Sequence, residues 1–219
     1  MTKDGATQYR SQMRLAVLLL AAGEGSRLGS RPKALLKKEG KTLIERSLEA
    51  VRSFAPVEFI LLTGFHAELI EAELRRFREI LSCPITIVRN ENPERGQYSS
   101  IRLGLESLKS DFDALLVCLS DQPQITYLEV TELVGAFGQR AADKQIILPM
   151  VNGQRGNPVL FSRGAIESIL AHADLVCRTY MDKYPEKVQM LETQNHAFVQ
   201  DVDYPEDAVK LGLQLSSPL

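Results

Sequence analysis

Short apolar runs that alternate with amphipathic stretches constrain the fold of this chain more than any other sequence feature. Each run is continuously hydrophobic, which is typical of a strand buried on both faces of a parallel sheet. We expect strands over 14–20, 57–62, 85–90, 114–120 and 145–150. Strands that alternate with helices form right-handed βαβ crossovers, which predicts a three-layer α/β/α, Rossmann-like fold with a mostly parallel sheet.

The stretches between these runs carry helical periodicity and capping signals. Apolar residues three or four positions apart share one helix face, and Thr followed three residues later by Glu predicts a helix start. The predicted helices are marked by Ile44, Leu48 and Val51 after Thr42 and Glu45, by Leu69, Leu74, Phe77 and Leu81 within 66–81, by Ile101, Leu105 and Leu108, and by Thr126 with Glu129. After residue 150 we expect added or antiparallel strands at 157–161 and 198–203, a helix from Gly164, and a last helix near Pro205.

Composition excludes several classes of protein. The chain has 219 residues, 26 Lys+Arg against 28 Asp+Glu, and 44% hydrophobic residues, which predicts an ordinary globular chain of about one domain. The balanced charge argues against a nucleic-acid partner, and no apolar run reaches the ~20 residues that span a bilayer. The three cysteines form no CxxC pair and residues 1–13 lack an apolar signal segment, so we expect a cytoplasmic protein without a disulfide framework or a membrane partner.

A glycine-rich loop directly follows the first predicted strand, at a position where open α/β sheets bind ligands. It reads AAGEGSRLG over 21–29, and Pro32-Lys33 follows. Glycine lets backbone N–H groups approach phosphate oxygens, and Arg27 and Lys33 add two cations, which suits a triphosphate or a pyrophosphate leaving group. The alternative is a turn that carries an exposed Arg and Lys.

Two known phosphate-loop patterns fit this stretch less well. The dinucleotide pattern G-x-G-x-x-G needs a third glycine one residue earlier than Gly29, which argues against NAD. A Walker A pattern would end at Gly40-Lys41-Thr42, but position 35 is Leu where that pattern has its first glycine. Thr42 is also better used as the cap of the following helix.

Two aspartates stand at the ends of predicted strands. Asp121 follows 114–120, and Asp203 ends 198–203, in which Asp201 and Asp203 share one strand face. Each could instead be a turn or helix-capping residue. Beside a phosphate loop, two carboxylates predict a Mg²⁺ site, because Mg²⁺ is held by one or two carboxylates together with substrate phosphates. The histidines, at 66, 172 and 196, show no metal-binding spacing.

These residues predict phosphoryl-type chemistry, which depends on positioning and on neutralisation of charge. Mg²⁺ on Asp121 and Asp203 would polarise the α-phosphate of a nucleotide, while Arg27 and Lys33 would stabilise the departing pyrophosphate. An attacking phosphate is already ionised, so no dedicated acid or base is required. The sequence accordingly shows no evident Ser-His-Asp or Cys-His constellation and no G-x-S-x-G elbow.

Several motifs resemble those of the MobA-like nucleotidyltransferases, the family of molybdenum-cofactor guanylyl- and cytidylyltransferases. The motifs are LLAAGEGSRLGSRPKALL at 19–36, Asn92-Pro93 with Gly96, SSIRLGL at 99–105, SDQP at 120–123, GQRGNPVLF at 153–161 and DVDYPED at 201–207. The resemblance implies transfer of NMP from an NTP to a phosphorylated acceptor, with Mg²⁺ and release of pyrophosphate. The AAG start and the KALL segment at 33–36 look more like the cytidylyltransferase branch, which implies CTP and molybdopterin as substrates.

We expect one domain over 14–219, preceded by a polar extension over 1–13. The resemblance also implies roles for particular residues of this domain. A nucleotide-binding half, about 14–123, would contact the nucleotide through Leu20, Ala21, Ala22, Gly23, Gly25, Arg27, Lys33, Ser99 and Ser100. The acceptor would contact Gln122 and Pro123 and, in an acceptor-binding half of about 124–219, Arg155, Gly156, Asn157 and Pro158. The implied catalytic residues are Arg27, Lys33 and Asp121, and the implied metal ligands are Asp121 and Asp203. A molybdoenzyme or its chaperone is the implied recipient of the product.

One segment departs from the family pattern. The acceptor element G-D-x-G-A-R has lost its glycines and reads Asp174-Leu175-Val176-Cys177-Arg178, and one extra residue precedes Pro32-Lys33. Two alternatives therefore stay open. One is the same chemistry with GTP, or with a sugar or polyol phosphate as acceptor. The other is a nucleotide-binding protein that delivers a cofactor without turnover.

Overall fold

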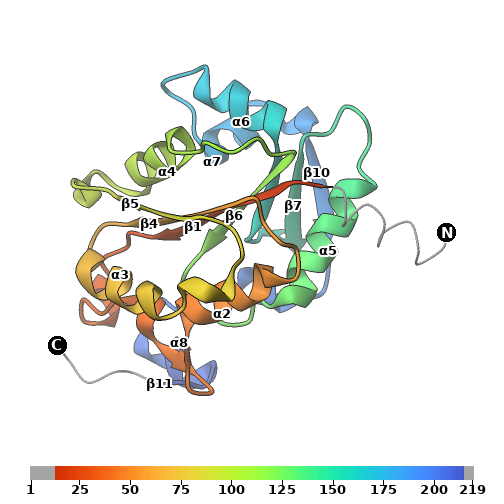
Figure 1. Cartoon of the computed structure of the whole chain (residues 1–219). Helices are drawn as coiled ribbons and strands as arrows, with labels where there is room; N and C mark the ends of the chain where they lie inside the picture. Colours follow the sequence, from red (N-terminus) through yellow and green to blue (C-terminus); the bar gives the residue numbers. More distant parts are fainter. Residues whose placement is uncertain (1–12, 215–219) are drawn as a thin grey trace.

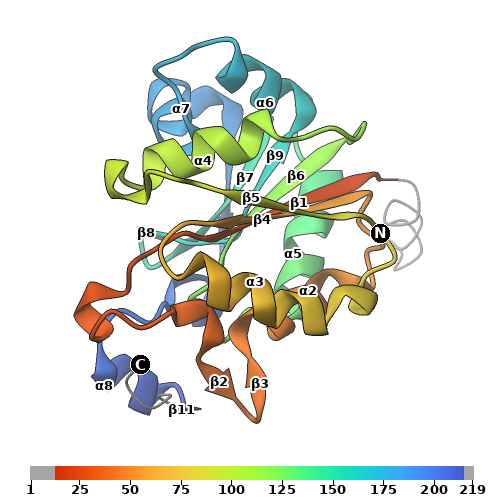
Figure 2. The same ribbon diagram turned by 60° about the vertical axis from the view of Figure 1, so that its left-hand side comes forward.

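A mixed β-sheet forms the centre of the molecule (Figures 1 and 2). The computed structural model describes residues 13–214, so the expected extension over 1–13 lies outside the described residues apart from Met13. The strand order is β10-β7-β9-β6-β1-β4-β5, and β8 pairs with β7. The strands of this sheet are β1 (Leu15–Ala21), β4 (Glu58–Thr63), β5 (Ile85–Arg89), β6 (Ala114–Leu119), β7 (Ile146–Val151), β8 (Gln154–Arg155), β9 (Val159–Ser162) and β10 (Val188–Glu192).

Most neighbouring strands are parallel, as the alternating apolar pattern predicts. β1 pairs in parallel with β4 and β6, β5 with β4, and β10 with β7. β9 is antiparallel to both β6 and β7, so β7 runs in the same direction as β6. The carboxyl ends of β1, β4, β6 and β7 therefore meet at one edge of the sheet, called here the carboxyl edge. The expected mostly parallel sheet with antiparallel additions is confirmed.

Helices cover both faces of the sheet and complete three layers. On one face lie α2 (Leu43–Arg52), α3 (Ala67–Arg76) and α5 (Tyr127–Gly138), and on the other lie α4 (Gln97–Glu106), α6 (Arg163–Leu170) and α7 (Cys177–Lys183) (Figure 1). A small antiparallel sheet joins β11 (Leu213–Gln214), β2 (Lys37–Lys38) and β3 (Lys41–Thr42), next to α8 (Pro205–Lys210) (Figure 2). Within residues 13–214, no helix has the length and apolar character needed to cross a membrane.

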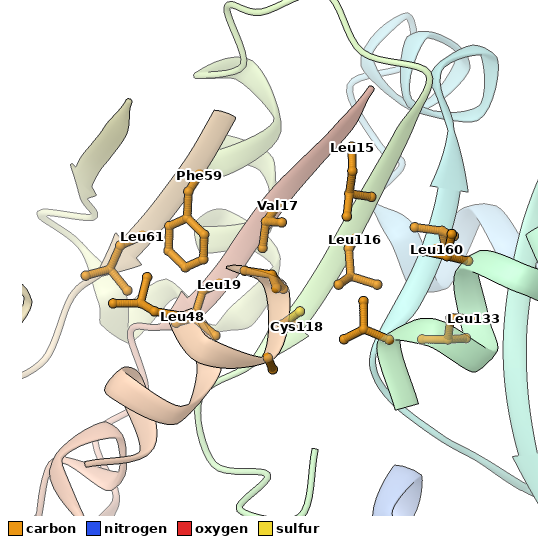
Figure 3. Close-up of a cluster of buried hydrophobic side chains, with 14 of the residues drawn as sticks. Leu15, Val17, Leu19, Leu48, Phe59, Leu61, Leu116, Cys118, Leu133 and Leu160 are labelled. Carbon is orange, nitrogen blue, oxygen red and sulfur yellow. The ribbon is translucent and has the colours of Figure 1, made fainter. Parts of the chain in front are cut away.

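Alternate residues of β1 enter two separate apolar cores. Leu15, Val17 and Leu19 pack on the side of α2 and α5, where Figure 3 shows them with side chains from β4, β6 and β9. Leu18 and its alternate neighbours pack on the side of α4, α6 and α7. All seven residues of β1 are buried, and full burial of a Leu-sized side chain contributes about 1.5–3 kcal/mol. The end of β1, and with it the start of the glycine-rich loop, is fixed by this packing.

A close contact between α4 and β1 depends on Gly104. A Cβ atom at this position would lie 2.7 Å from Leu18 Cδ1 and 3.2 Å from Leu62 Cδ1, closer than packed carbon atoms tolerate. The missing side chain lets the axis of α4 approach the sheet. The N-terminus of α4 is thereby held over the carboxyl edge.

The two predicted helix starts are present in the structure. At α5, the N–H of Leu128 donates to Thr126 Oγ1, and Glu129 Oε2 accepts from the Thr126 N–H, which is a reciprocal capping arrangement. At α2, Thr42 Oγ1 accepts the N–H of Glu45. Gly40 and Lys41 belong to the β2–β3 hairpin, so the Walker A interpretation is excluded.

Several predicted elements differ from the structure. The predicted strand at 198–203 is wrong: Asn195 accepts the N–H of Ala197 and starts a 3₁₀ helix, η6 (His196–Val199), and no strand follows before α8. The predicted helix over 66–81 ends at Arg76 and is followed by a 3₁₀ turn, η3 (Arg78–Ile80). Leu69, expected in the core, is 41% exposed. α7, β8, β10 and the small sheet were not predicted.

Arg102 connects α4 to the end of α6. Its guanidinium donates to the backbone carbonyls of Ile169, Leu170 and His172 at 2.8–3.2 Å, and its Nε lies 2.6 Å from Glu106 Oε1. The last carbonyls of a helix have no partner within the helix, so one side chain satisfies several of them. The helix that carries part of the site is thus tied to the helix beside it.

We expect Arg102→Ala to lower the free energy of unfolding by about 2 kcal/mol, because hydrogen bonds to a charged group contribute about 1.5–3 kcal/mol and the half-buried carbonyls of Ile169 and Leu170 would lose this donor. Urea unfolding followed by circular dichroism measures the change. Arg75→Ala, at an exposed position of α3, is the matched control and should stay within about 0.5 kcal/mol of the parent chain. Equal effects of the two substitutions would contradict a connecting role for Arg102.

Candidate active site

The glycine-rich loop leaves β1 at the carboxyl edge and turns through a short 3₁₀ helix, η1 (Ser26–Leu28). Gly25 has φ +68°, and a Cβ there would lie 2.2 Å from the carbonyl oxygen of Arg31, so this position requires glycine. A Cβ on Gly23, in contrast, would meet no atom within 4 Å. Gly25 therefore shapes the loop itself, and Gly23 leaves open space above the strand end.

A hollow of about 330 Å³, called here the loop cleft, lies between this loop, the ends of β1 and β6, and the start of α4. Seven of the residues predicted to contact the nucleotide line it: Leu20, Ala21, Ala22, Gly23, Gly25, Lys33 and Ser100. Arg27 and Ser99 lie outside the lining. Other residues, to which the sequence interpretation gave no contact with the nucleotide, also line the cleft, namely Glu24, Ala34, Phe65, Ile70, Pro93, Gly96, Gln97, Leu119 and Ser120.

A hydrogen-bonded group of three side chains holds the start of α4 against this cleft. Asn90 Nδ2 donates to Ser99 Oγ at 3.0 Å and to Ser100 Oγ at 2.9 Å. Ser99 Oγ in turn donates to the carbonyl of Gly96. Ser99 acts within the helix start, whereas Ser100 also faces the cleft. The sequence interpretation did not include Asn90 among the site residues. Its position directly after β5, at the carboxyl edge, would have indicated it.

Lys33 links the two predicted metal ligands. The 3₁₀ turn η2 (Lys33–Leu35) places Lys33 Nζ 2.9 Å from Asp121 Oδ2 and 2.5 Å from Asp203 Oδ1. Arg27 Nη1 lies 3.1 Å from the other oxygen of Asp203, and its guanidinium lies 5.5 Å from the centre of the Tyr204 ring. The structure thus brings together the two cations and two carboxylates that the sequence singled out.

Backbone hydrogen bonds carry the C-terminal acidic segment to this place. The N–H of Val202 donates to the backbone carbonyl of Asp121 at 3.0 Å. The Phe198 carbonyl accepts both Gln122 Nε2 at 3.0 Å and the N–H of Asn157 at 2.8 Å. Asp203 therefore reaches Asp121 through these contacts rather than as part of the predicted strand.

The charges of this group shift the pKa values of its members. Burial alone would lower the pKa of Lys33, but the carboxylates of Asp121 and Asp203 outweigh burial and raise it. The hydrogen bond from Lys33 lowers the pKa of Asp203 against the opposing effect of burial. For Asp201, burial raises the pKa, and the negative charge of Asp121 raises it further. Lys33 and Asp203 therefore form an ion pair at neutral pH.

The donor set fits a divalent cation. Asp121, Asp201 and Asp203 each offer one carboxylate oxygen, and these oxygens lie within 4.8 Å of one another. Asp121 Oδ1 is buried and has no hydrogen-bond partner among the described residues, which is unfavourable unless a further group pairs with it. Carboxylate oxygens are the ligands that Mg²⁺ and Mn²⁺ favour. Asp201, not chosen as a ligand from the sequence, belongs to this group.

A second hollow, of about 610 Å³ and called here the side hollow, lies under α4 and α7 beside β6, β7 and β9. Three of the predicted acceptor-binding residues line it: Arg155, Gly156 and Asn157. Gln122, Pro123 and Pro158 are buried and line neither hollow; Gln122 holds the Phe198 carbonyl. The predicted acceptor residues thus divide into a group at the hollow and a group inside the protein.

Solved structures share this arrangement of sheet and helices. Rv0371c from Mycobacterium tuberculosis H37Rv superposes with a TM-score of 0.71 at 22% identity, over 90% of this chain and 97% of that one. The complex of Rv0371c with manganese superposes with a TM-score of 0.62 at 19% identity, over 91% of this chain and 98% of that one. The inositol-1-phosphate CTP transferase from T. maritima superposes with a TM-score of 0.60 at 16% identity, over 89% of this chain and 91% of that one. The fold is that of the nucleotidyltransferases.

Within that class, the chain belongs to the family of MobA-like NTP transferase domains, whose family model matches residues 17–188. Nicotine blue oxidoreductase from Paenarthrobacter nicotinovorans is 29% identical over 203 residues, which are 89% of this chain and 94% of that protein. The bifunctional protein GlmU from Synechococcus sp. (strain CC9311) is 30% identical over 163 residues, 73% of this chain. The chain spans about a third of the length of the GlmU proteins that it matches (35% of this one).

We expect the contribution of Asp203 to stability to disappear in acid. Its pKa is lower in the folded state than in the unfolded state, so the unfolded state takes up the proton first, and stability falls as the pH falls towards the folded-state pKa. At pH 7, Asp203→Asn should be less stable than the parent by no more than about 1 kcal/mol, since the pair is partly exposed. This gap should close below pH 4.

Urea unfolding at pH 7, 5 and 3 measures this gap. Glu206→Gln is the matched control, because Glu206 is exposed and makes no ion pair among the described residues. A gap between Asp203→Asn and the parent that stays constant with pH would show that the substitution acts through packing rather than charge.

Proposed function

We propose that this chain is a Mg²⁺-dependent nucleotidyltransferase that moves NMP from an NTP to a phosphorylated small-molecule acceptor, with CTP and molybdopterin favoured. The observation that carries the proposal is the position of Lys33, which joins Asp121 and Asp203 at the rim of the loop cleft. A cation and carboxylates beside a glycine-rich loop suit a polyphosphate that arrives with a divalent ion.

In the proposed reaction, an oxygen of the acceptor phosphate attacks the α-phosphorus of the NTP. A P–O bond forms there, and the bond from the α-phosphorus to its bridging oxygen breaks, so that the electron pair leaves with pyrophosphate. A bound Mg²⁺, held by Asp121 and Asp203, would supply positive charge to the phosphate oxygens. Lys33 and Arg27 stabilise the leaving pyrophosphate, and the open backbone at Gly23 receives the nucleotide.

Likeness to other proteins supports CTP as the nucleotide and a phosphorylated small molecule as the acceptor. A CTP transferase that uses inositol 1-phosphate shares the fold, which is consistent with CTP and with a polyol phosphate as the alternative acceptor. The motif at 33–36 favours the cytidylyltransferase branch. The manganese complex of Rv0371c is consistent with a divalent ion in this fold. GTP, and cofactor delivery without turnover, remain the alternatives that the assays below separate.

A redox reaction is the second candidate function. One relative that matches the chain over nearly its whole length is named an oxidoreductase. The group of three carboxylates, in which Asp121 Oδ1 has no hydrogen-bond partner within residues 13–214, favours the transferase, because hydride transfer does not require a divalent ion beside a phosphate loop. Incubation with NADH or NADPH and a dye acceptor, followed at 340 nm, tests this candidate directly.

Among the four NTPs with Mg²⁺, we expect CTP to raise the melting temperature most, because a ligand that binds only the folded state stabilises it. The same titration without Mg²⁺ should give a smaller shift. Differential scanning fluorimetry of the full chain measures both. A larger shift with GTP would reassign the nucleotide, and no shift with any NTP would contradict nucleotide binding at the loop cleft.

Asp121→Asn should lower the rate of pyrophosphate release by at least about 100-fold, since loss of one group that stabilises transition-state charge costs about 10²–10³ in rate. Lys33→Met should have a comparable effect. A coupled pyrophosphate assay with CTP and an acceptor measures the rates. Asp143→Asn, at an exposed loop position, is the matched control and should retain full activity.

The outcomes of this assay separate the open alternatives. Full activity of Asp121→Asn would refute the assignment of Asp121 as a metal ligand. Tight binding of nucleotide without pyrophosphate, whichever acceptor is supplied, would favour the delivery protein over the enzyme.

A further inference from the structure

Three loops at the carboxyl edge pack against one another beside the loop cleft. A Cβ atom on Gly64, which follows β4, would lie 2.9 Å from Ala22 Cβ in the glycine-rich loop and 2.8 Å from Pro93 Cβ after β5, so no side chain fits there. The N–H of Phe65 donates to the Ala22 carbonyl at 3.4 Å. The glycine-rich loop therefore rests against the loop that follows β4.

His66 makes a polar contact between these two loops. Its imidazole Nε2 lies 2.9 Å from the carbonyl oxygen of Glu24. A carbonyl oxygen can only accept a hydrogen bond, so Nε2 carries a proton and donates. His66 lines a neighbouring hollow of about 410 Å³ and not the loop cleft. Its ring therefore acts on the glycine-rich loop from outside the cleft.

The backbone of His66 is unfavourable for a residue with a side chain. With φ +58° and ψ +23° it lies in the left-handed region, which favours glycine. His66 also precedes the first turn of α3 without capping that helix through its side chain. Within residues 13–214, the hydrogen bond to Glu24 is the one polar contact that the ring makes. The ring thus supplies a contact that glycine, which this backbone favours, could not.

This hydrogen bond fixes the peptide group between Glu24 and Gly25. The carbonyl and the N–H of a trans peptide point in opposite directions, so a carbonyl held towards His66 directs the Gly25 N–H away from it. Glycine has little backbone preference, and both neighbours of Glu24 are glycines. Without the hydrogen bond, the peptide would turn over at little cost and carry its carbonyl oxygen to the opposite side.

Three successive N–H groups of the loop are available to an anion. Those of Gly23, Glu24 and Gly25 donate to no other residue within 13–214, and all three residues line the loop cleft. Successive N–H groups that face one space bind phosphate oxygens, whereas a carbonyl oxygen in their place would repel a phosphate. The orientation of the peptide between Glu24 and Gly25 therefore affects how strongly the loop attracts a polyphosphate.

We propose that His66 is a positioning residue for the nucleotide, which holds the Glu24 carbonyl and so keeps the Gly25 N–H available to the phosphates. The inference rests on the proposed function, since it requires a polyphosphate in the loop cleft, and it adds a residue that lies outside that cleft. Affinity for the phosphates then depends on a hydrogen-bond donor at position 66 and not on how well the backbone there suits the residue.

Three substitutions of His66 separate the donor from the backbone. His66→Gln keeps an N–H donor near the position of Nε2, His66→Leu removes the donor, and both keep a Cβ atom on the left-handed backbone. His66→Gly removes the donor and relieves the backbone. Isothermal titration of the full chain with CTP, and separately with inorganic tripolyphosphate, each with Mg²⁺, measures the affinities.

We expect His66→Leu and His66→Gly to weaken the binding of both ligands at least about fivefold, because a charge-assisted hydrogen bond from the loop to the phosphates is lost. His66→Gln should stay within about twofold of the parent chain, since it restores the donor. Urea unfolding should rank the variants differently. The midpoint of His66→Gly should be no lower than that of His66→Leu, because only the glycine suits this backbone.

Matched controls lie away from the loop. His172 makes the same kind of contact, with ring Nδ1 2.9 Å from the Ser168 carbonyl, and lines neither the loop cleft nor the side hollow. Ala55→Gly relieves a left-handed backbone, with φ +44°, at an exposed position. Neither His172→Leu nor Ala55→Gly should change the affinities. Full affinity of His66→Leu, equal losses in His66→Gln and His66→Leu, or a loss for CTP without one for tripolyphosphate would overturn the inference.

These outcomes are distinct from failure of the proposed function. If the affinities follow the donor at position 66 and the chain releases no pyrophosphate from any NTP, the role of His66 stands and the transferase reaction does not. If pyrophosphate is released while His66→Leu binds CTP at full affinity, the reaction stands and the role of His66 does not. A parent chain that binds neither CTP nor tripolyphosphate would contradict both.

Discussion

The ion pairs of Lys33 with Asp121 and Asp203 are the interaction on which the rest of the site depends. These three residues come from the loop after β1, the end of β6 and the segment before α8, so they join distant parts of the sequence at one point. Three carboxylates so close together repel one another, and the ammonium group offsets that repulsion. The same charges would receive a polyphosphate and its cation. The stability of the site and, in the proposed function, its affinity for the nucleotide therefore both depend on the Lys33 ammonium group.

The sheet explains why these segments converge. Parallel strands share a carboxyl edge, and the antiparallel insertion of β9 keeps β7 in the same direction as β6. Both hollows therefore open at one edge, and α4, seated closely on β1 through Gly104, forms part of each. In the proposed function, the nucleotide and the acceptor would approach from two sides of α4. The geometry follows from strand direction rather than from any single side chain.

Much of the fold could be predicted from the sequence. A buried strand such as Leu15–Ala21 is recognised by its uninterrupted apolar residues, and the helix after Thr126 is recognised by the capping pair Thr126 and Glu129. The prediction of secondary structure failed where the local residue pattern favours one conformation and contacts with distant residues impose another. The alternation of Asp201, Val202 and Asp203 is typical of a strand, but the Val202 N–H bonds to Asp121 instead. Likewise Asn90 and Asp201 enter the site through contacts that spacing alone does not reveal.

The hydrogen bonds that place Asp203 involve the main chain of Asp121, Val202, Phe198 and Asn157. Main-chain groups are the same in nearly every amino acid, so side-chain substitutions leave them in place. The side hollow is different, since residues such as Met181 and Arg178 define it by their side chains. If the proposed function holds, a few point mutations in the side hollow would change the acceptor and leave the residues proposed for phosphate chemistry unaltered. The choice of acceptor could then change during evolution without any change in the main-chain contacts that place Asp203.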